Sequence, residues 1–254
     1  MSEASFANEM QLPNLAEPYQ QGLRLAIDYI LERYSPLGLI VGGSIIRGNP
    51  GPTSDFDIYV IHNQPFRQRL QIRFNGTPAE IFVNSPAAVR RYFEDEWKAG
   101  RPITAHILTT GVVALNQDPL VDQLIHEAQE WLAKCPALSD AELLWKRYLI
   151  VDGLDNARDL IDNDSANAAF FLHDAVQAML NYYFLAANQN LPRYKEIVAT
   201  LEKTHPDLGG LVRSYYGASE PKQQLALAEQ IALLTIGTTE FFEWESAQEV
   251  YPRD

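Results

Sequence analysis

Cysteine is almost absent from this chain of 254 residues. Cys135 stands alone, so an internal disulfide is excluded, and a chain this poor in cysteine suits a reducing compartment. The opening stretch MSEASFANEMQLPNL lacks the basic and apolar regions of a signal peptide. The sequence also lacks any run of the roughly 18 uninterrupted apolar residues that a membrane span requires. We therefore expect a cytoplasmic protein.

Two common kinds of catalytic pattern are also missing. The 5 histidines are scattered, with no His-x-x-x-His or Cys-x-x-Cys pair, which argues against a zinc site. No Gly-x-Ser-x-Gly sequence is present, and this leaves a serine hydrolase without support. The chemistry has to come from other residues.

Basic residues are few compared with acidic ones. The 20 lysines and arginines face 33 aspartates and glutamates, which gives a formal net charge of −13. Such a surface repels phosphate backbones, which argues against a nucleic-acid partner, and the lack of a long apolar run argues against a membrane. It is compatible with a cationic small molecule or with bound divalent metal ions, although many soluble proteins are this acidic without a functional reason. No pattern indicates the oligomeric state.

The first half of the chain mixes two kinds of periodicity, which predicts both helices and strands. Helices are expected over 17–34, 86–98 and 119–134, with another near Ile103 and a short helix start over 44–48. Strands are expected over 37–43, 55–61, 66–74, 79–84 and 112–115. Asn75-Gly76 between two of these strands is a strong hairpin signal.

From Ser139 onward the patterns are helical throughout, over 139–162, 164–188, 192–204, 207–216 and 220–240. Ser139 has the position of a helix N-cap, with Glu142 in the first turn. The predicted fold class is therefore α+β, in two domains. Residues 1–135 form a small mixed sheet flanked by helices, and residues 136–254 form an all-helical bundle that binds substrate or nucleotide.

Two carboxylates occur in an otherwise apolar strand. Alternate residues of a strand share a face, so Asp55 and Asp57 project together while Phe56 and Ile58 face the core. Two carboxylates this close repel each other unless a cation lies between them. Magnesium prefers carboxylate oxygens and completes its shell with water and substrate phosphate. The pair therefore predicts a magnesium site.

The segment Gly42-Gly43-Ser44 provides a second element of such a site. It lies between a predicted strand and a predicted helix start, where free N–H groups and the helix dipole bind anions. Glycine lets a phosphate approach the backbone, and the Ser44 hydroxyl can donate a hydrogen bond. A phosphate cradle beside a carboxylate pair is the arrangement of two-metal phosphoryl or nucleotidyl transfer.

A third acidic residue should come from a neighbouring strand. Glu80 opens the sequence AEIFVN, and the hairpin can bring it beside Asp57. There it can bind metal or act as general base, and the sequence leaves both roles open. An isolated Asp-x-Asp is more often a solvated strand face or a turn, but the combination of all three elements in this order favours an active site.

The sequence GGSIIRG…SDFDIYV, within residues 37–85, resembles the signature of the DNA polymerase beta-like nucleotidyltransferase superfamily. The resemblance implies that Gly43 and Ser44 hold the triphosphate, that Asp55 and Asp57 bind two Mg²⁺ ions, and that Glu80 completes the triad. The family's third carboxylate is usually an aspartate. A glutamate, as in some antibiotic adenylyltransferases, leaves the division between ligand and base unsettled.

The helical half is similar to the C-terminal region of streptomycin/spectinomycin-type aminoglycoside adenylyltransferases. The similar stretch is LPRYKEIVATLEKTHPDLGGLVRSYYG, although its spacing is shorter than in those enzymes. The resemblance implies that Lys195 reaches the nucleotide phosphates and that Tyr215 packs near the base. An exposed lysine and a core tyrosine are the equally plain alternatives.

Four aspartates of the predicted helix 139–162 follow one another at spacings of three or four, which places them on one face. They are Asp152, Asp155, Asp159 and Asp162. A solvated face is the default interpretation. The competing hypothesis is an acidic wall, extended by Asp174, that faces a cleft between the domains and binds a cationic acceptor.

Together these observations predict a metal-dependent nucleotidyltransferase. It would move a nucleoside monophosphate, AMP from ATP, onto a hydroxyl of a small acceptor such as an aminoglycoside, a reaction typical of antibiotic resistance, and release pyrophosphate. Two alternatives remain open. One is a toxin–antitoxin type nucleotidyltransferase that modifies a protein or a tRNA, and the other is an inactive module that senses nucleotide.

Overall fold

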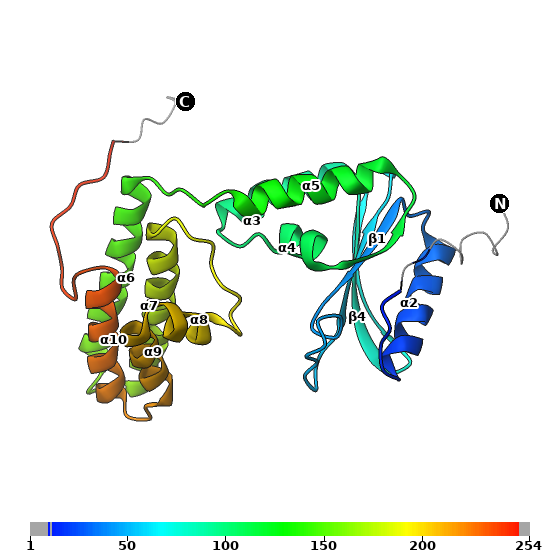
Figure 1. Cartoon of the computed structure of the whole chain (residues 1–254). Helices are drawn as coiled ribbons and strands as arrows, with labels where there is room; N and C mark the ends of the chain where they lie inside the picture. The colour runs from blue at the N-terminus through cyan, green and yellow to red at the C-terminus, as the bar shows by residue number, and fades with distance from the viewer. Residues whose placement is uncertain (1–9, 11, 249–254) are drawn as a thin grey trace. The chain divides into compact units, whose positions relative to one another are not determined.

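The computed structural model describes residue 10 and residues 12–248. The chain divides into two compact units, Met1–Lys134 and Cys135–Asp254. The first unit is a sheet flanked by helices and the second is helical, which confirms the α+β class (Figure 1). In the part of the chain that the structure describes, no helix has the length and apolar character of a membrane span.

The N-terminal unit contains a five-stranded mixed sheet with the order β3-β4-β2-β1-β5. Its strands are β1 (Gly38–Gly42), β2 (Phe56–Ile61), β3 (Arg67–Phe74), β4 (Thr77–Asn84) and β5 (Val112–Asn116). Its helices are α2 (Tyr19–Arg33), α3 (Pro86–Lys98), α4 (Ile103–Thr110) and α5 (Pro119–Ala133). The pairs β1–β2, β1–β5 and β3–β4 are antiparallel, whereas β2 and β4 run parallel.

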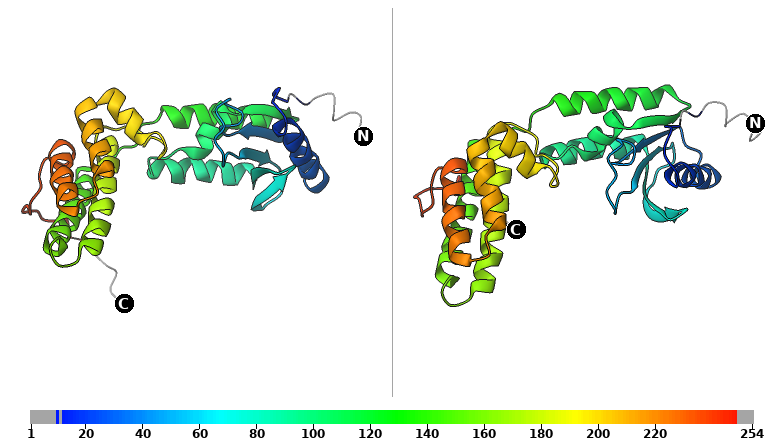
Figure 2. Two further views of the ribbon diagram at one scale, coloured as in Figure 1. Left: turned by 90° about the horizontal axis from the view of Figure 1, so that it is seen from below. Right: turned by 60° about the horizontal axis from the view of Figure 1, so that its bottom comes forward.

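Helices cover both faces of this sheet. Phe56, Ile58 and Val60 of β2 pack in one core with the apolar stripe of α2. Tyr59 and Ile61, which alternate with them, pack in a second core with α3, α4 and α5. Figures 1 and 2 show α2 on one side of the sheet and α5 on the other. The period of two along β2 thus decides which helix layer each side chain meets.

The helical unit consists of α6 (Asp140–Leu160), α7 (Ser165–Ala186), α8 (Ile197–Thr204), α9 (Pro206–Gly217) and α10 (Pro221–Thr235). Its core joins residues of all five helices, with Leu154, Leu172 and Val212 fully buried. Ser139 is the N-cap of α6 as predicted, and Glu142 completes a capping box with it.

One predicted helix is absent from the structure, and the ends of several other predicted elements differ. Residues 44–48 form a hydrogen-bonded turn and no helix, because Gly48 has a φ of +76° and a stretch rich in proline and glycine follows. The helix expected from 192 begins at Ile197, and the one expected to reach 240 ends at Thr235, just before Gly237 with a φ of +74°. Helix α6 ends at Leu160, so Asp162 lies beyond it.

Candidate active site

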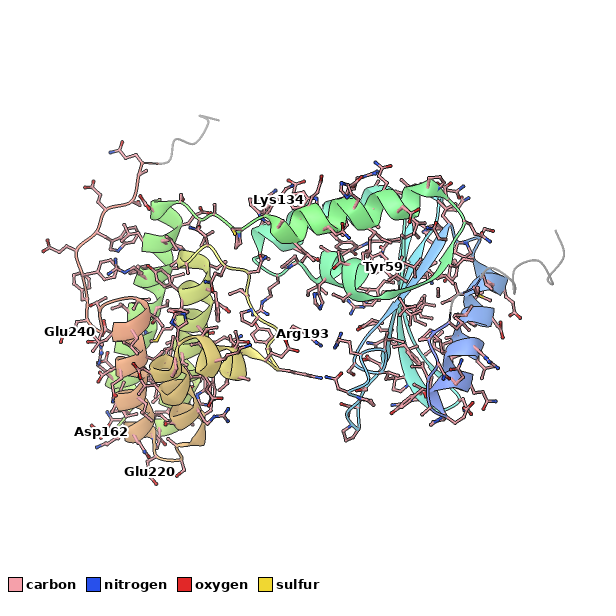
Figure 3. The ribbon with its side chains drawn as sticks, viewed as in Figure 1. Tyr59, Lys134, Asp162, Arg193, Glu220 and Glu240 are labelled. Atoms are coloured by element: carbon pink, nitrogen blue, oxygen red, sulfur yellow. The ribbon has the colours of Figure 1, made fainter. Side chains whose placement is uncertain are left out.

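The sheet register brings the predicted carboxylates together. Asp57 lies in β2 opposite Gly42 of the antiparallel strand β1 and opposite Glu80 of the parallel strand β4. Asp55 directly precedes β2, so the strand begins one residue later than the predicted start at Asp55. Side chains at the same level of adjacent strands share a face, so Asp57 and Glu80 both lie on the face that carries Tyr59, labelled in Figure 3.

One carboxylate oxygen from each of Asp55, Asp57 and Glu80 lies within 4.8 Å of the other two. All three residues are partly buried. An exclusively oxygen donor set of this kind fits a hard divalent cation such as Mg²⁺ and does not fit a soft metal. The arrangement can neutralise the negative charge of a phosphate group through bound metal.

Gly43 determines how closely the turn approaches this carboxylate cluster. Its φ is +100°, a conformation that side-chain-bearing residues rarely adopt. A Cβ atom at this position would lie 2.8 Å from the Asp55 carbonyl oxygen and 3.4 Å from Asp57 Oδ2. The neighbouring Gly42 has only ordinary contacts around it. Of the two predicted glycines, Gly43 is therefore the one that the local geometry requires.

The hydroxyl of Ser44 is connected to the strand that carries the aspartates. Ser44 Oγ lies 2.5 Å from Ser54 Oγ, and Ser54 Oγ also accepts a hydrogen bond of 2.8 Å from the Gly51 N–H. Ser54 immediately precedes Asp55 in the sequence. It was part of the recognised motif but had no predicted role, and the structure shows that it links the turn to the Asp55 segment.

Sequence reasoning missed two residues that donate hydrogen bonds to the third carboxylate. Glu80 Oε1 accepts hydrogen bonds from Arg69 Nε at 2.8 Å, from Arg69 Nη2 at 2.5 Å and from Gln71 Nε2 at 3.1 Å. Both residues belong to β3, which pairs with β4 so that Gln71 lies opposite Glu80. The alternation of polar residues in RQRLQIRF was the available signal, but the register was needed to assign it.

A pocket of about 400 Å³ lies on the same unit but does not include the carboxylates. Ser54, Arg73 and Thr77 are among the residues that line it. It therefore does not coincide with the carboxylate cluster.

The two residues predicted to contact nucleotide from the helical unit differ in exposure. Lys195 is exposed and lies in a turn before α8, and not on a helix as predicted. Tyr215 is fully buried in the helical core, and its hydroxyl lies 2.6 Å from His173 Nδ1. Burial raises the pKa of this tyrosine. The placement of Tyr215 favours the core-packing alternative over a base contact.

The acidic stripe of the helical unit already contains cationic partners. Asp155 pairs with Arg158 at 2.6 Å, and Asp162, labelled in Figure 3, pairs with Lys222 of α10 at 2.6 Å. Asp152, Asp159 and Asp174 are exposed. These ion pairs relieve the repulsion along the stripe without a ligand, which favours the solvated-face interpretation for Asp155 and Asp162.

Comparison with known proteins agrees with the geometry of the carboxylates and the glycine turn. Residues 23–112 match the family model of the nucleotidyltransferase domain, and this segment contains Gly42–Ser44, Asp55, Asp57 and Glu80. The chain contains a nucleotidyltransferase domain. A nucleotidyltransferase uses a nucleotide substrate, so the triad and the glycine turn fit a metal-dependent nucleotidyl transfer.

Comparisons of the whole chain are more distant. A nucleotidyltransferase-like protein from Exiguobacterium sibiricum, known from its crystal structure, aligns with 86% of this chain and 77% of its own at 13% sequence identity and a TM-score of 0.48. A search of curated proteins finds no match. Neither comparison indicates which acceptor this nucleotidyltransferase modifies.

Proposed function

We propose that this nucleotidyltransferase transfers AMP from ATP to a hydroxyl group of a small acceptor and releases pyrophosphate. The observation that supports this most directly is the convergence of Asp55, Asp57 and Glu80, each with a carboxylate oxygen within 4.8 Å of the others. The matched domain family supplies the reaction class. ATP as the donor follows the resemblance to adenylyltransferases.

The carboxylates would hold two Mg²⁺ ions. When bound, these ions stabilise negative charge on the phosphates and lower the pKa of the acceptor hydroxyl. Asp55 and Asp57 provide ligand oxygens from two positions of one chain segment, and Glu80 provides one from the adjacent strand. The mutual repulsion of the three carboxylates favours cation binding.

The glycine turn would bind the triphosphate of the nucleotide. Gly42 and Gly43 present backbone without side-chain atoms, and Ser44 presents a hydroxyl tied to Ser54 at 2.5 Å. From the helical unit, exposed Lys195 is a candidate for the phosphates. Tyr215 is fully buried in the helical core and is therefore left out of the proposed nucleotide site.

The acceptor would be a hydroxylated and cationic molecule such as an aminoglycoside. This part of the proposal depends on the resemblance of the helical unit and on the exposed carboxylates Asp152, Asp159 and Asp174. A charged hydrogen bond to an ammonium group of the acceptor is typically worth about 1.5–3 kcal/mol. Asp155 contributes less to such a site because Arg158 already pairs with it.

The reaction is tested by incubating the protein with labelled ATP, Mg²⁺ and a panel of aminoglycosides, neutral sugars, tRNA and protein acceptors. Asp57→Asn should reduce both acceptor labelling and pyrophosphate release by at least about 100-fold, since loss of metal-mediated charge stabilisation costs several kcal/mol in the transition state. Asp95→Asn is the matched control, because Asp95 is an exposed carboxylate of α3 that pairs with Arg91.

Each outcome of the acceptor screen has a distinct meaning. Labelling of an aminoglycoside by the wild type supports the proposal, whereas labelling of tRNA or protein would assign the toxin–antitoxin type activity. ATP binding without any released pyrophosphate would indicate a nucleotide sensor. Full activity of Asp57→Asn would show that the carboxylate cluster is not the catalytic site.

A further inference from the structure

Glu80 differs from its two partners in length and therefore in what must hold it in place. A glutamate side chain has one more rotatable bond than an aspartate, so its carboxylate can occupy more positions relative to Asp57. The Glu80 side chain retains 15% of its exposure, and it lies in β4 between two other strands. A precise metal ligand at this position requires additional contacts that fix its orientation.

The edge strand β3 provides these contacts through its register. Gln71 lies directly opposite Glu80, and Arg69 lies opposite Phe82, two residues further along β4 on the same face. The guanidinium carbon of Arg69 lies 4.8 Å from the centre of the Phe82 ring, and this stacking holds the plane of the guanidinium. Arg69 thus reaches Glu80 from a supported position, although 65% of its side chain is exposed.

Three donor atoms of Arg69 and Gln71 are directed to one oxygen atom of Glu80. Arg69 Nε, Arg69 Nη2 and Gln71 Nε2 all donate to Glu80 Oε1, and none of these hydrogen bonds involves Oε2. A side-by-side arginine–carboxylate pair would instead engage both oxygens. The observed arrangement divides the carboxylate into one oxygen bound by the protein and one left to a ligand.

We propose that Arg69, assisted by Gln71, is a positioning residue that holds Glu80 through Oε1 and so directs Oε2 as a single-oxygen ligand to the metal ion shared with Asp57. This inference rests on the proposed metal-dependent function. It assigns Glu80 as a metal ligand through Oε2, because the guanidinium engages Oε1. In this role Arg69 itself would touch neither the metal nor the nucleotide.

The positioning role predicts a change in metal affinity opposite to the one that the charge of Arg69 predicts, which makes the proposal testable. By charge alone, removal of an arginine beside a cation site should strengthen the binding of a divalent cation. If Arg69 positions a ligand, its removal should weaken that binding instead, by roughly 10-fold, as loss of a residue that orients a metal ligand typically does. The two explanations therefore predict opposite shifts.

The experiment measures binding of Mn²⁺ to the full chain from the electron paramagnetic resonance signal of the free ion. The variants are Arg69→Gln and the matched control Arg73→Gln. Arg73 lies on the same face of β3, but it donates to the Gly76 carbonyl at 3.2 Å and makes no hydrogen bond to Glu80. Arg69→Gln should bind Mn²⁺ about 10-fold more weakly than the wild type, whereas Arg73→Gln should bind it equally well or more tightly.

A double variant tests whether Arg69 acts through Glu80. In the Glu80→Gln background, Arg69→Gln should cause no further loss of Mn²⁺ affinity, because the residue that it orients is already gone. Gln71→Ala should weaken binding in the same direction as Arg69→Gln but by a smaller factor. Circular dichroism of each variant shows whether the sheet is intact, and Gln71→Ala carries the test if Arg69→Gln does not fold.

Different results would contradict the positioning role of Arg69 and the metal site itself. The positioning role alone is overturned if Arg69→Gln binds Mn²⁺ as tightly as Arg73→Gln. It is also overturned if Arg69→Gln causes the same loss of Mn²⁺ affinity in the Glu80→Gln background as in the wild type. If Glu80→Gln and Asp57→Asn both leave Mn²⁺ binding unchanged, the metal site itself is wrong, and the proposed function fails with it.

Discussion

At the scale of single residues, Gly43 shows how a backbone conformation creates a site. Its positive φ bends the chain directly after β1, so the turn passes close to the Asp55 carbonyl. Gly48 also has a positive φ, but nothing lies within 4 Å of the position of its missing Cβ atom. Both glycines therefore have a positive φ, but only at Gly43 would a Cβ atom also clash with neighbouring atoms.

We predict that Gly43→Ala lowers stability by about 1–3 kcal/mol and also weakens Mn²⁺ binding, because the new Cβ displaces the Asp55 backbone. Gly48→Ala should lower stability by about 1–2 kcal/mol and leave Mn²⁺ binding intact. Urea unfolding measures the stability of each variant, and the electron paramagnetic resonance assay measures its affinity for Mn²⁺. Unchanged Mn²⁺ affinity in Gly43→Ala would show that the carboxylate cluster does not depend on this close approach.

At the scale of secondary-structure elements, Glu96 connects two helices on the sheet. Helix α4 has Pro102 at its N-cap and no side-chain cap of its own. Glu96 of α3 replaces that cap, since it accepts hydrogen bonds from the Thr104 N–H at 2.6 Å and from Thr104 Oγ1 at 2.8 Å. Burial raises the pKa of Glu96 above its ordinary value of 4.5, and the Thr104 hydrogen bonds oppose this shift in part.

This raised pKa predicts a pH dependence of stability. Folding favours the protonated form of Glu96, so its contribution is fully present below pH 4.5 and is lost as the pH rises through the folded pKa. The free energy of unfolding of the wild type relative to Glu96→Gln should therefore be lower at about pH 7 than at about pH 4. Urea titrations of both proteins at the two pH values measure this difference.

Glu94 provides a control with the opposite sign on the same helix. The hydrogen bond that Lys98 donates to Glu94 lowers the pKa of Glu94. The contribution of Glu94 to stability is therefore present above its ordinary pKa and is lost as the pH falls through its pKa in the folded protein. The wild type relative to Glu94→Gln should gain slightly in stability from low to neutral pH. If the wild type also gains stability relative to Glu96→Gln from low to neutral pH, the effect assigned to the burial of Glu96 is wrong.

At the scale of the whole molecule, the two units have separate cores. The apolar cores of the sheet unit and the core of the helical unit contain no residue in common. Leu154 of α6 is fully buried in the helical core. A local loss of packing there should affect mainly the unit to which it belongs.

We predict that Leu154→Ala destabilises the helical unit by about 2–5 kcal/mol, the usual cost of truncating a buried leucine. Hydrogen exchange followed by mass spectrometry should then show faster exchange in α6 and α7, while exchange in β1 and β2 stays as in the wild type. Leu149→Ala is the control, because Leu149 of the same helix is 50% exposed. Equal acceleration in the sheet would indicate that the two units unfold together.

The sequence by itself determined the α+β class, the position where the helical region begins, and the identity of the three carboxylates. These follow from local properties: periodicity distinguishes strand from helix, Ser139 with Glu142 marks a helix start, and the spacing of Asp55 and Asp57 places both on one face. Element ends were less predictable, because Gly237 and the turn over 194–196 stop helices that periodicity alone would extend.

The tertiary structure alone decided what surrounds those carboxylates. The parallel register of β2 with β4 places Glu80 beside Asp57, and the antiparallel register of β3 with β4 places Arg69 and Gln71 on Glu80. The burial of Tyr215 and the ion pair of Asp162 with Lys222 likewise depend on packing between helices. Strand register and helix packing are contacts between residues distant in the chain, so local sequence patterns do not specify them.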